Sequence, residues 1–224
     1  MFSSTKSNPA GQEIQLFDVS DLSVPRADQI ITSFNPNTIL RAKVVLVGDA
    51  ECGKTSIVQS ILSNGQNYPK KYNMTTEIDL AVKEVSIPDT NVTVDLFFYD
   101  VPGASTFHQR GLQSKHYNDA SIVVCVFDIS SRKSFQSCAK WIQSVRSAQA
   151  DFPTNEVEVI LVANKVDLRE DKADGDVSLA EVEDSEGECF ANDNGFRYFE
   201  TSVLDGYNLD TLVLHIATQI YKYL

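Results

Sequence analysis

Long hydrophobic runs are missing from this sequence, and so is any pattern of paired cysteines. No stretch reaches about 18 consecutive apolar residues, so no transmembrane helix is expected. Residues 1–11 lack the apolar core of a secretory signal peptide, so none is expected there either. The four cysteines are scattered among 224 residues without a Cys-x-x-Cys pair, which is typical of reduced thiols in a cytosolic compartment. We therefore expect neither a disulfide scaffold nor a membrane-spanning protein.

Positive charge is also scarce, with 19 lysines and arginines against 31 aspartates and glutamates. The net charge of −12 creates a field that does not attract nucleic acid or anionic lipid, so no nucleic-acid partner is expected. Residues 219–224 contain no cysteine, so no direct prenyl lipid anchor is expected at that end. The three histidines, His108, His116 and His215, have no metal-ligand spacing and are expected to be structural or surface residues.

The acidity is concentrated in residues 170–188, which hold nine carboxylates against one lysine. Such a run usually forms a solvated loop and helix face. The alternative is a docking surface for a basic partner. In either case this face is not expected to contact phosphate or a membrane.

Residues 1–38 differ in character from the rest of the chain. They are rich in serine, asparagine and aspartate and contain three of the seven prolines. This composition predicts a mobile N-terminal arm. Residues 39–224 are then predicted to form one globular domain.

Apolar runs and amphipathic segments alternate along the predicted domain. Short continuous apolar runs indicate strands buried on both faces, and apolar residues at helical spacing indicate covering helices. Two runs separated by Pro-Asp-Thr-Asn predict a β-hairpin. The pattern predicts an α/β fold: a six-stranded, mostly parallel sheet with one antiparallel edge strand and helices on both faces. The predicted strands are residues 43–47, 78–87, 92–100, 121–128, 157–163 and 196–202, and the predicted helices lie at 55–65, around 135–145 and at 209–220.

The octapeptide Gly-Asp-Ala-Glu-Cys-Gly-Lys-Thr at residues 48–55 follows a predicted strand and precedes a predicted helix. It fits the pattern G-x-x-x-x-G-K-[ST], in which glycines let the loop turn its backbone N–H groups toward phosphate oxygens. Lys54 adds a positive charge at the β- and γ-phosphates, and the Thr55 hydroxyl is a Mg²⁺ ligand. The motif therefore predicts a nucleotide-phosphate site. Its predicted contacts are Glu51, Cys52, Gly53, Lys54, Thr55 and Ser56.

Two further residues have alternative interpretations. Cys52 lies in the phosphate loop, where a lowered pKa would make its thiol redox-sensitive; an inert side chain at a permissive position is the plainer interpretation. Trp141 lies beside the apolar stripe of its predicted helix, and we expect it to serve packing rather than recognition.

The tetrapeptide Asn-Lys-Val-Asp at residues 164–167 follows another buried strand at the same end of the sheet. Asp167 can accept two hydrogen bonds from the N1–H and the exocyclic amine of guanine, a donor pair that adenine lacks. Asn164 can reach the N7 side of the base, and the stem of Lys165 can lie across the ring. The sequence therefore predicts a guanine nucleotide. The predicted guanine contacts are Asn164, Lys165 and Asp167, with Ser202 and Val203 from the loop after the last strand.

The segment Asp-Val-Pro-Gly at residues 100–103 closes the second strand of the hairpin. Its aspartate, Asp100, would hold Mg²⁺ through a water molecule. Its glycine, Gly103, would direct its N–H to the γ-phosphate. A second phosphate-sensing loop is therefore predicted here.

Taken in order, these loops resemble those of the Ras superfamily of small GTPases, and the run Val-Phe-Asp-Ile-Ser … Ser-Phe … Trp resembles its Rab branch. Residues 67–98, with their Met-Thr-Thr … Asp and Ile-Pro-Asp-Thr elements, closely resemble the Rab-like small GTPase subunit of intraflagellar transport complex B. The resemblance extends from about residue 41 to residue 222 and leaves out the N-terminal arm.

This resemblance implies a small-GTPase fold that binds GTP or GDP with Mg²⁺. It makes Thr75 the threonine that senses the γ-phosphate, with Thr76 as the alternative one residue later. The metal contacts are then Thr55, Thr75 and, through water, Asp100. The resemblance also implies a small β-sandwich subunit of complex B and other complex B subunits as partners, in the cilium or flagellum and the cytoplasm.

The sequence departs from the Ras pattern at several positions. Ala104 stands where most members have the glutamine that positions the attacking water, so no catalytic residue is assigned. Ala50 and Glu51 occupy positions that are often glycine, and Leu204 stands where a lysine commonly supports the guanine site. We expect a GTP-binding switch or assembly subunit with very slow hydrolysis of its own. The alternative is a conventional Rab-type vesicle-trafficking GTPase that turns over with a helper protein; a P-loop kinase is disfavoured because it has no use for a guanine clamp.

Overall fold

The computed structural model describes residues 6–7, 13–14, 38–65, 74–103, 117–149, 157–169 and 178–222. By its internal contacts the chain divides into two units, Met1–Pro36 and Asn37–Leu224. In the first unit, the short strands β1 (Lys6–Ser7) and β2 (Glu13–Ile14) pair in antiparallel fashion. That the N-terminal residues form a mobile arm stays a prediction.

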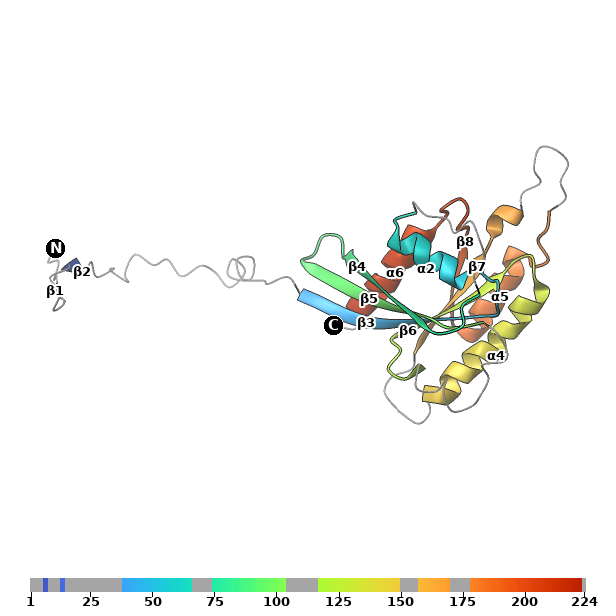
Figure 1. The fold of residues 1–224 in the computed structure, drawn as a ribbon, viewed down its shortest axis with the longest axis horizontal. Coiled ribbons are helices and arrows are strands. Elements are labelled where there is room, and N and C mark those ends of the chain that lie inside the picture. The colour runs from blue at the N-terminus through green and yellow to red at the C-terminus, as the bar shows by residue number, and fades with distance from the viewer. Residues whose placement is uncertain are drawn as a thin grey trace. The chain divides into compact units, whose positions relative to one another are not determined.

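The second unit is built on a six-stranded sheet. Its strands are β3 (Thr38–Val47), β4 (Asp79–Ser86), β5 (Val92–Asp100), β6 (Ile122–Asp128), β7 (Glu158–Asn164) and β8 (Arg197–Thr201). They are arranged in the order β4-β5-β3-β6-β7-β8 (Figure 1). Every neighbouring pair is parallel except the hairpin of β4 and β5, which places an antiparallel strand at one edge. The predicted α/β fold class is therefore confirmed.

Helices cover both faces of this sheet (Figure 1). They are α2 (Lys54–Leu62), α4 (Arg132–Gln149), α5 (Asp184–Asn194), α6 (Leu209–Lys222) and the 3₁₀ helix η3 (Val166–Leu168). The cores under α2 and α6 and under α4 and α5 are separate, because successive side chains of a strand point to opposite faces. In β3, Val44 and Leu46 belong to the first core, and Val45 and Val47 belong to the second.

Strand β3 begins at Thr38, five residues before the apolar run from which it was predicted. Residues 38–42 pair with β5 but extend beyond the pairing with β6, which begins at Val44. This part of the strand is consequently covered less fully, and its side chains alternate between exposed and half-buried up to the buried Ala42. A search for continuously apolar residues finds only the fully covered half of such a strand.

Helix α5 begins inside the acidic run, which the sequence predicted to form a solvated loop and helix face. Glu183 and Glu186 form a reciprocal capping box at its N-terminus, and Arg132 pairs with Glu186 from the start of α4. Carboxylates are favoured there because the helix dipole is positive at its N-terminus. In the described part of the run, residues 178–188, several negative charges thus have structural roles; residues 170–177 lie outside the described residues.

The carboxyl ends of the five parallel strands lie along one edge of the sheet, so the loops that follow them gather there. These loops contain the motifs singled out from the sequence: residues 48–53 after β3, 101–103 after β5, 165–169 after β7 and 202–208 after β8. Among the helices of the described segments, none is both long enough and apolar enough to cross a membrane.

Candidate nucleotide-binding site

The loop of residues 48–53 joins β3 to α2 and makes a sharp turn at its end. Gly53 caps α2 with a left-handed backbone, at φ 92°. A Cβ atom at this position would overlap the side-chain nitrogen of Asn164. Only glycine therefore allows the loop to enter the helix while it lies against the end of β7. Ser56, also predicted as a contact, is half-buried in the first turn of α2.

Lys54 is the first residue of α2 and is only 6% exposed. Its ammonium group donates hydrogen bonds to the carbonyl oxygens of Gly48, at 2.9 Å, and of Asp49, at 2.8 Å. Burial lowers the pKa of Lys54, and the nearby charge of Asp100 opposes that change. The loop thus holds a desolvated cation at its centre, an arrangement that suits an anionic ligand.

Three oxygen-bearing side chains from separate segments meet beside Lys54. The Thr55 hydroxyl donates to Oδ2 of Asp100 at the end of β5, so the Thr75 hydroxyl, 2.8 Å away, donates to Thr55. Asp100 is 2% exposed; burial raises its pKa, while the hydrogen bond from Thr55 and the charge of Lys54 oppose this. Thr76, the alternative to Thr75, is exposed. The structure thus brings together the three predicted metal contacts.

This cluster fits a Mg²⁺ ion. Oδ1 of Asp100 is buried and has no hydrogen-bond partner among the described residues, so it can face a cation directly or through water. Mg²⁺ takes oxygen ligands and usually binds through one or two carboxylates, with waters and substrate phosphates completing its shell. No group of three or more His, Cys, Asp or Glu side chains able to hold a metal occurs in the described segments.

The start of the predicted second phosphate-sensing loop lies directly against the loop of residues 48–53. The backbone N–H of Ala50 donates to the carbonyl oxygen of Gly103 at 3.1 Å. A Cβ atom on Gly103 would overlap the Ala50 nitrogen and lie 2.6 Å from the Asp49 carbonyl oxygen, so only glycine fits there. The next residue, Ala104, lies outside the described residues, as do His108 and His116.

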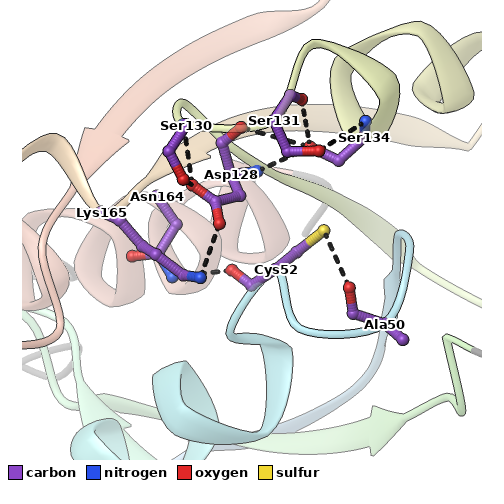
Figure 2. Close-up of polar contacts among 8 residues, drawn as sticks. All are labelled: Ala50, Cys52, Asp128, Ser130, Ser131, Ser134, Asn164 and Lys165. Carbon is purple, nitrogen blue, oxygen red and sulfur yellow. Dashed lines mark hydrogen bonds and ion pairs between the residues drawn. The ribbon is translucent and has the colours of Figure 1, made fainter. Parts of the chain in front are cut away.

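Asn164, the last residue of β7, holds the loop of residues 48–53, and the next residue, Lys165, pairs with the end of β6 (Figure 2). Asn164 donates from Nδ2 to the carbonyl oxygen of Cys52 at 2.8 Å, and its Oδ1 accepts a hydrogen bond from Thr201. Lys165 has a left-handed backbone, at φ 67°, and its ammonium lies 2.6 Å from Oδ2 of Asp128. Asn164 is 2% exposed and Lys165 is half-buried. These bonds fix the loop relative to the predicted guanine contacts.

Asp167 lies in η3 and is half-buried. The Ser202 hydroxyl donates to Oδ1 of Asp167 at 2.6 Å, which orients the carboxylate. Ser202 is itself held by a bridge to Tyr207, and the next residue, Val203, is buried. The predicted guanine contacts from two separate motifs therefore lie side by side, and their role in binding stays a prediction.

Asp128 was not assigned a role from the sequence. It lies at the end of β6, is 8% exposed, and accepts hydrogen bonds from the backbone and hydroxyl of Ser130 as well as pairing with Lys165 (Figure 2). Its carboxylate thereby sets the position of a predicted guanine contact. In the sequence, Asp128 is the aspartate of the Val-Phe-Asp-Ile-Ser run that resembles the Rab branch.

Trp141 does more than pack. It is the single tryptophan of the chain and is 3% exposed within the α4 core, as expected for a packing residue. Its indole N–H also donates to Oδ1 of Asp49 in the phosphate loop at 2.8 Å. Helix α4 therefore holds the loop from the side opposite to α2, through a contact between residues 92 positions apart.

An ion pair connects the segment that follows β7 to strand β8. Nη1 of Arg169, just after η3, lies 2.8 and 2.9 Å from the two carboxylate oxygens of Glu200, and the Tyr198 hydroxyl donates to the same carboxylate. Glu200 lies two residues before Ser202. This pair ties the segment after η3 to the strand that leads into Ser202, and sequence spacing gave no sign of it.

The interpretation of Cys52 as a reactive thiol is wrong. Its side chain is 1% exposed, and burial raises its pKa to about 11. A thiol of this kind is almost entirely protonated near neutral pH and is not a nucleophile. The residue belongs to the core under α2 and α6, and its contribution to the site is the backbone carbonyl that accepts from Asn164.

Comparison with known proteins gives consistent similarities over the unit that carries this site. The Ras family model matches residues 43–222. The chain is 34% identical over 183 residues to the intraflagellar transport protein 27 homolog of Homo sapiens, covering 82% of this chain and 91% of the relative. It is 33% identical over 184 residues to intraflagellar transport protein 27 of Chlamydomonas reinhardtii, covering 82% and 85%, and 35% identical over 178 residues to the homolog of Trypanosoma brucei brucei, covering 80% and 88%. The family match includes every predicted nucleotide and metal contact.

Proposed function

Because this chain belongs to the Ras family of small GTPases, and within it to the relatives of intraflagellar transport protein 27, we propose that it is a Mg²⁺-dependent GTP-binding subunit acting in intraflagellar transport. It serves as a switch or assembly subunit and hydrolyses GTP very slowly. The proposal that the protein binds a nucleotide rests on one observation. A loop around Lys54, an oxygen cluster around Asp100 and a carboxylate at Asp167 lie along the same edge of the sheet. That combination suits a guanine nucleotide with its metal ion.

In this proposal each group of residues has a separate task. Lys54 and the backbone N–H groups of its loop hold the phosphates. Thr55, Thr75 and Asp100 hold Mg²⁺, which neutralises charge on the phosphate oxygens. Asp167 selects guanine by accepting hydrogen bonds from the N1–H and the exocyclic amine of the base. The remaining proposed contacts complete the site: Glu51, Cys52, Gly53, Ser56, Gly103, Asn164, Lys165, Ser202 and Val203.

Slow hydrolysis is expected because Ala104 has no hydrogen-bonding side chain to orient the attacking water. The methyl group of Ala50 further occupies space beside the γ-phosphate, where a helper's arginine is normally accommodated. Even with glutamine present, unaided Ras-like proteins hydrolyse GTP at only about 10⁻⁴ per second. We therefore expect a rate at or below that value in single-turnover assays with saturating Mg²⁺. Ala104→Gln should raise the rate only modestly, since Ala50 remains.

Ala104→Leu is the matched control, because it adds bulk without a hydrogen-bonding group. It should hydrolyse no faster than the unchanged protein. A rate of about 10⁻² per second for the unchanged protein, the level reached when an arginine is supplied in cis, would contradict slow hydrolysis. That result would favour the conventional Rab-type enzyme instead.

The cellular setting is proposed from the relatives. Their names place them in intraflagellar transport. For this chain we propose the cilium or flagellum and the cytoplasm as locations. The small β-sandwich subunit of complex B and other complex B subunits are the proposed partners, as the family resemblance implies.

Co-expression tests this setting. The full chain and the β-sandwich subunit should elute together at the mass of a stoichiometric complex in size-exclusion chromatography. A tagged chain purified from ciliated cells should carry guanine nucleotide and other complex B subunits. Separate elution of the two chains, together with recovery on vesicle membranes, would instead support the vesicle-trafficking alternative.

A further inference from the structure

Glu51 stands in the phosphate loop with a backbone conformation that residues with a side chain rarely adopt. Its φ is 68°, in the left-handed region that glycine adopts freely and that strains the backbone of a residue with a Cβ atom. Such conformations persist only where the surroundings impose them, and they are concentrated at functional sites. Glycine would adopt this backbone conformation without strain, so the presence of glutamate at this position needs an explanation.

The neighbours of Glu51 impose this conformation. On one side, the N–H of Ala50 donates to the Gly103 carbonyl at 3.1 Å. On the other, the carbonyl of Cys52 accepts from Asn164 at 2.8 Å. These two bonds hold the backbone on both sides of residue 51 and favour the conformation observed there.

The carboxylate of Glu51 is exposed and lacks a neutralising partner in the described part of the chain. None of the ion pairs found there includes it. The nearby Lys54 directs its ammonium to the carbonyls of Gly48 and Asp49. Among the described residues, the proposed phosphate loop thus carries an exposed negative charge that is in no ion pair.

We propose that Glu51 weakens phosphate binding by charge repulsion and so speeds the release of both GDP and GTP. This inference rests on the proposed guanine-nucleotide function and supplies a way of regulating it. If hydrolysis is slow, release sets the lifetime of each nucleotide state, and Glu51 shortens that lifetime without a helper protein. The repulsion between this carboxylate and a phosphate acts only while nucleotide is bound, so the charge of Glu51 changes the affinity.

Two substitutions separate charge from strain. Glu51→Gln removes the charge and keeps the side chain, whereas Glu51→Gly removes both the charge and the strain. At low ionic strength both should slow the release of a fluorescent GDP analogue, and tighten its binding, by about tenfold. At about 1 M salt, where charges are screened beyond roughly 3 Å, the difference from the unchanged protein should largely vanish. Only Glu51→Gly should also raise the melting temperature without nucleotide.

Glu84→Gln is the matched control, because Glu84 is exposed on β4, away from the loops, and its loss changes the net charge equally. It should leave the release rate unchanged. Release from Glu51→Gln at the rate of the unchanged protein, or a tenfold effect that persists at high salt, overturns the inference while guanine-nucleotide binding stands. If neither the unchanged protein nor any variant binds the GDP analogue, the proposed function fails and this inference fails with it.

Discussion

Asp167→Asn is expected to change the preference of this protein from GTP to xanthosine triphosphate. In xanthine a carbonyl replaces the exocyclic amine of guanine, so it accepts a hydrogen bond where guanine donates one. An asparagine at this position can still accept from Ser202 through its oxygen, as Asp167 does at 2.6 Å, and can present its amide nitrogen to the new carbonyl. Titration with the two triphosphates measures the change.

The expected size of this effect follows from the hydrogen bonds that are lost. Each bond to a charged group contributes about 1.5–3 kcal/mol, so GTP should bind at least about 100-fold more weakly. Asp205→Asn is the matched control: Asp205 contacts the same Ser202 hydroxyl, at 3.3 Å, but is exposed. It should leave both affinities unchanged. Equal binding of ATP and GTP by the unchanged protein would contradict the assignment of Asp167.

The fold was predictable because its strands are continuously apolar and its helices are amphipathic. All seven residues of β6 are buried, and the buried residues of α6 repeat at helical spacing. Elements that depart from these patterns were predicted less completely from the sequence. The first half of β3 is only partly covered, and α5 combines a weakly apolar face with an acidic first turn, so neither shows the expected periodicity.

The loops of the site were also predictable, because each is a short motif at a strand end. What could not be predicted is how the loops are held together. Trp141 and Asp49 are 92 positions apart, and Lys165 and Asp128 are 37 positions apart. Such contacts depend on which strands are neighbours and on how the helices pack. The spacing of nearby residues in the sequence determines neither. The conformation of Glu51 belongs to the same class, since its φ is set by partners on other elements.

Lys54→Met is expected to remove most of the affinity for guanine nucleotides while leaving the fold intact. Methionine retains an unbranched, flexible stem that can fill the space of this 6% exposed side chain. It has no ammonium group for the phosphates, and a charge-assisted bond of that kind contributes about 3 kcal/mol, or roughly 100-fold in affinity. Calorimetric titration with GDP and GTP measures the loss, and circular dichroism with thermal melting measures the fold.

Lys43→Met is the matched control for this substitution. Lys43 is a half-buried lysine on β3, less buried than Lys54, that donates to the Asn118 carbonyl at 2.8 Å and stacks on Tyr99; it lies outside residues 48–55. Its replacement should leave nucleotide affinity unchanged, whatever it does to the melting temperature. If Lys54→Met bound GTP as tightly as the unchanged protein, residues 48–55 would be an ordinary strand-to-helix turn. The buried ammonium would then serve only to hold the carbonyls of Gly48 and Asp49.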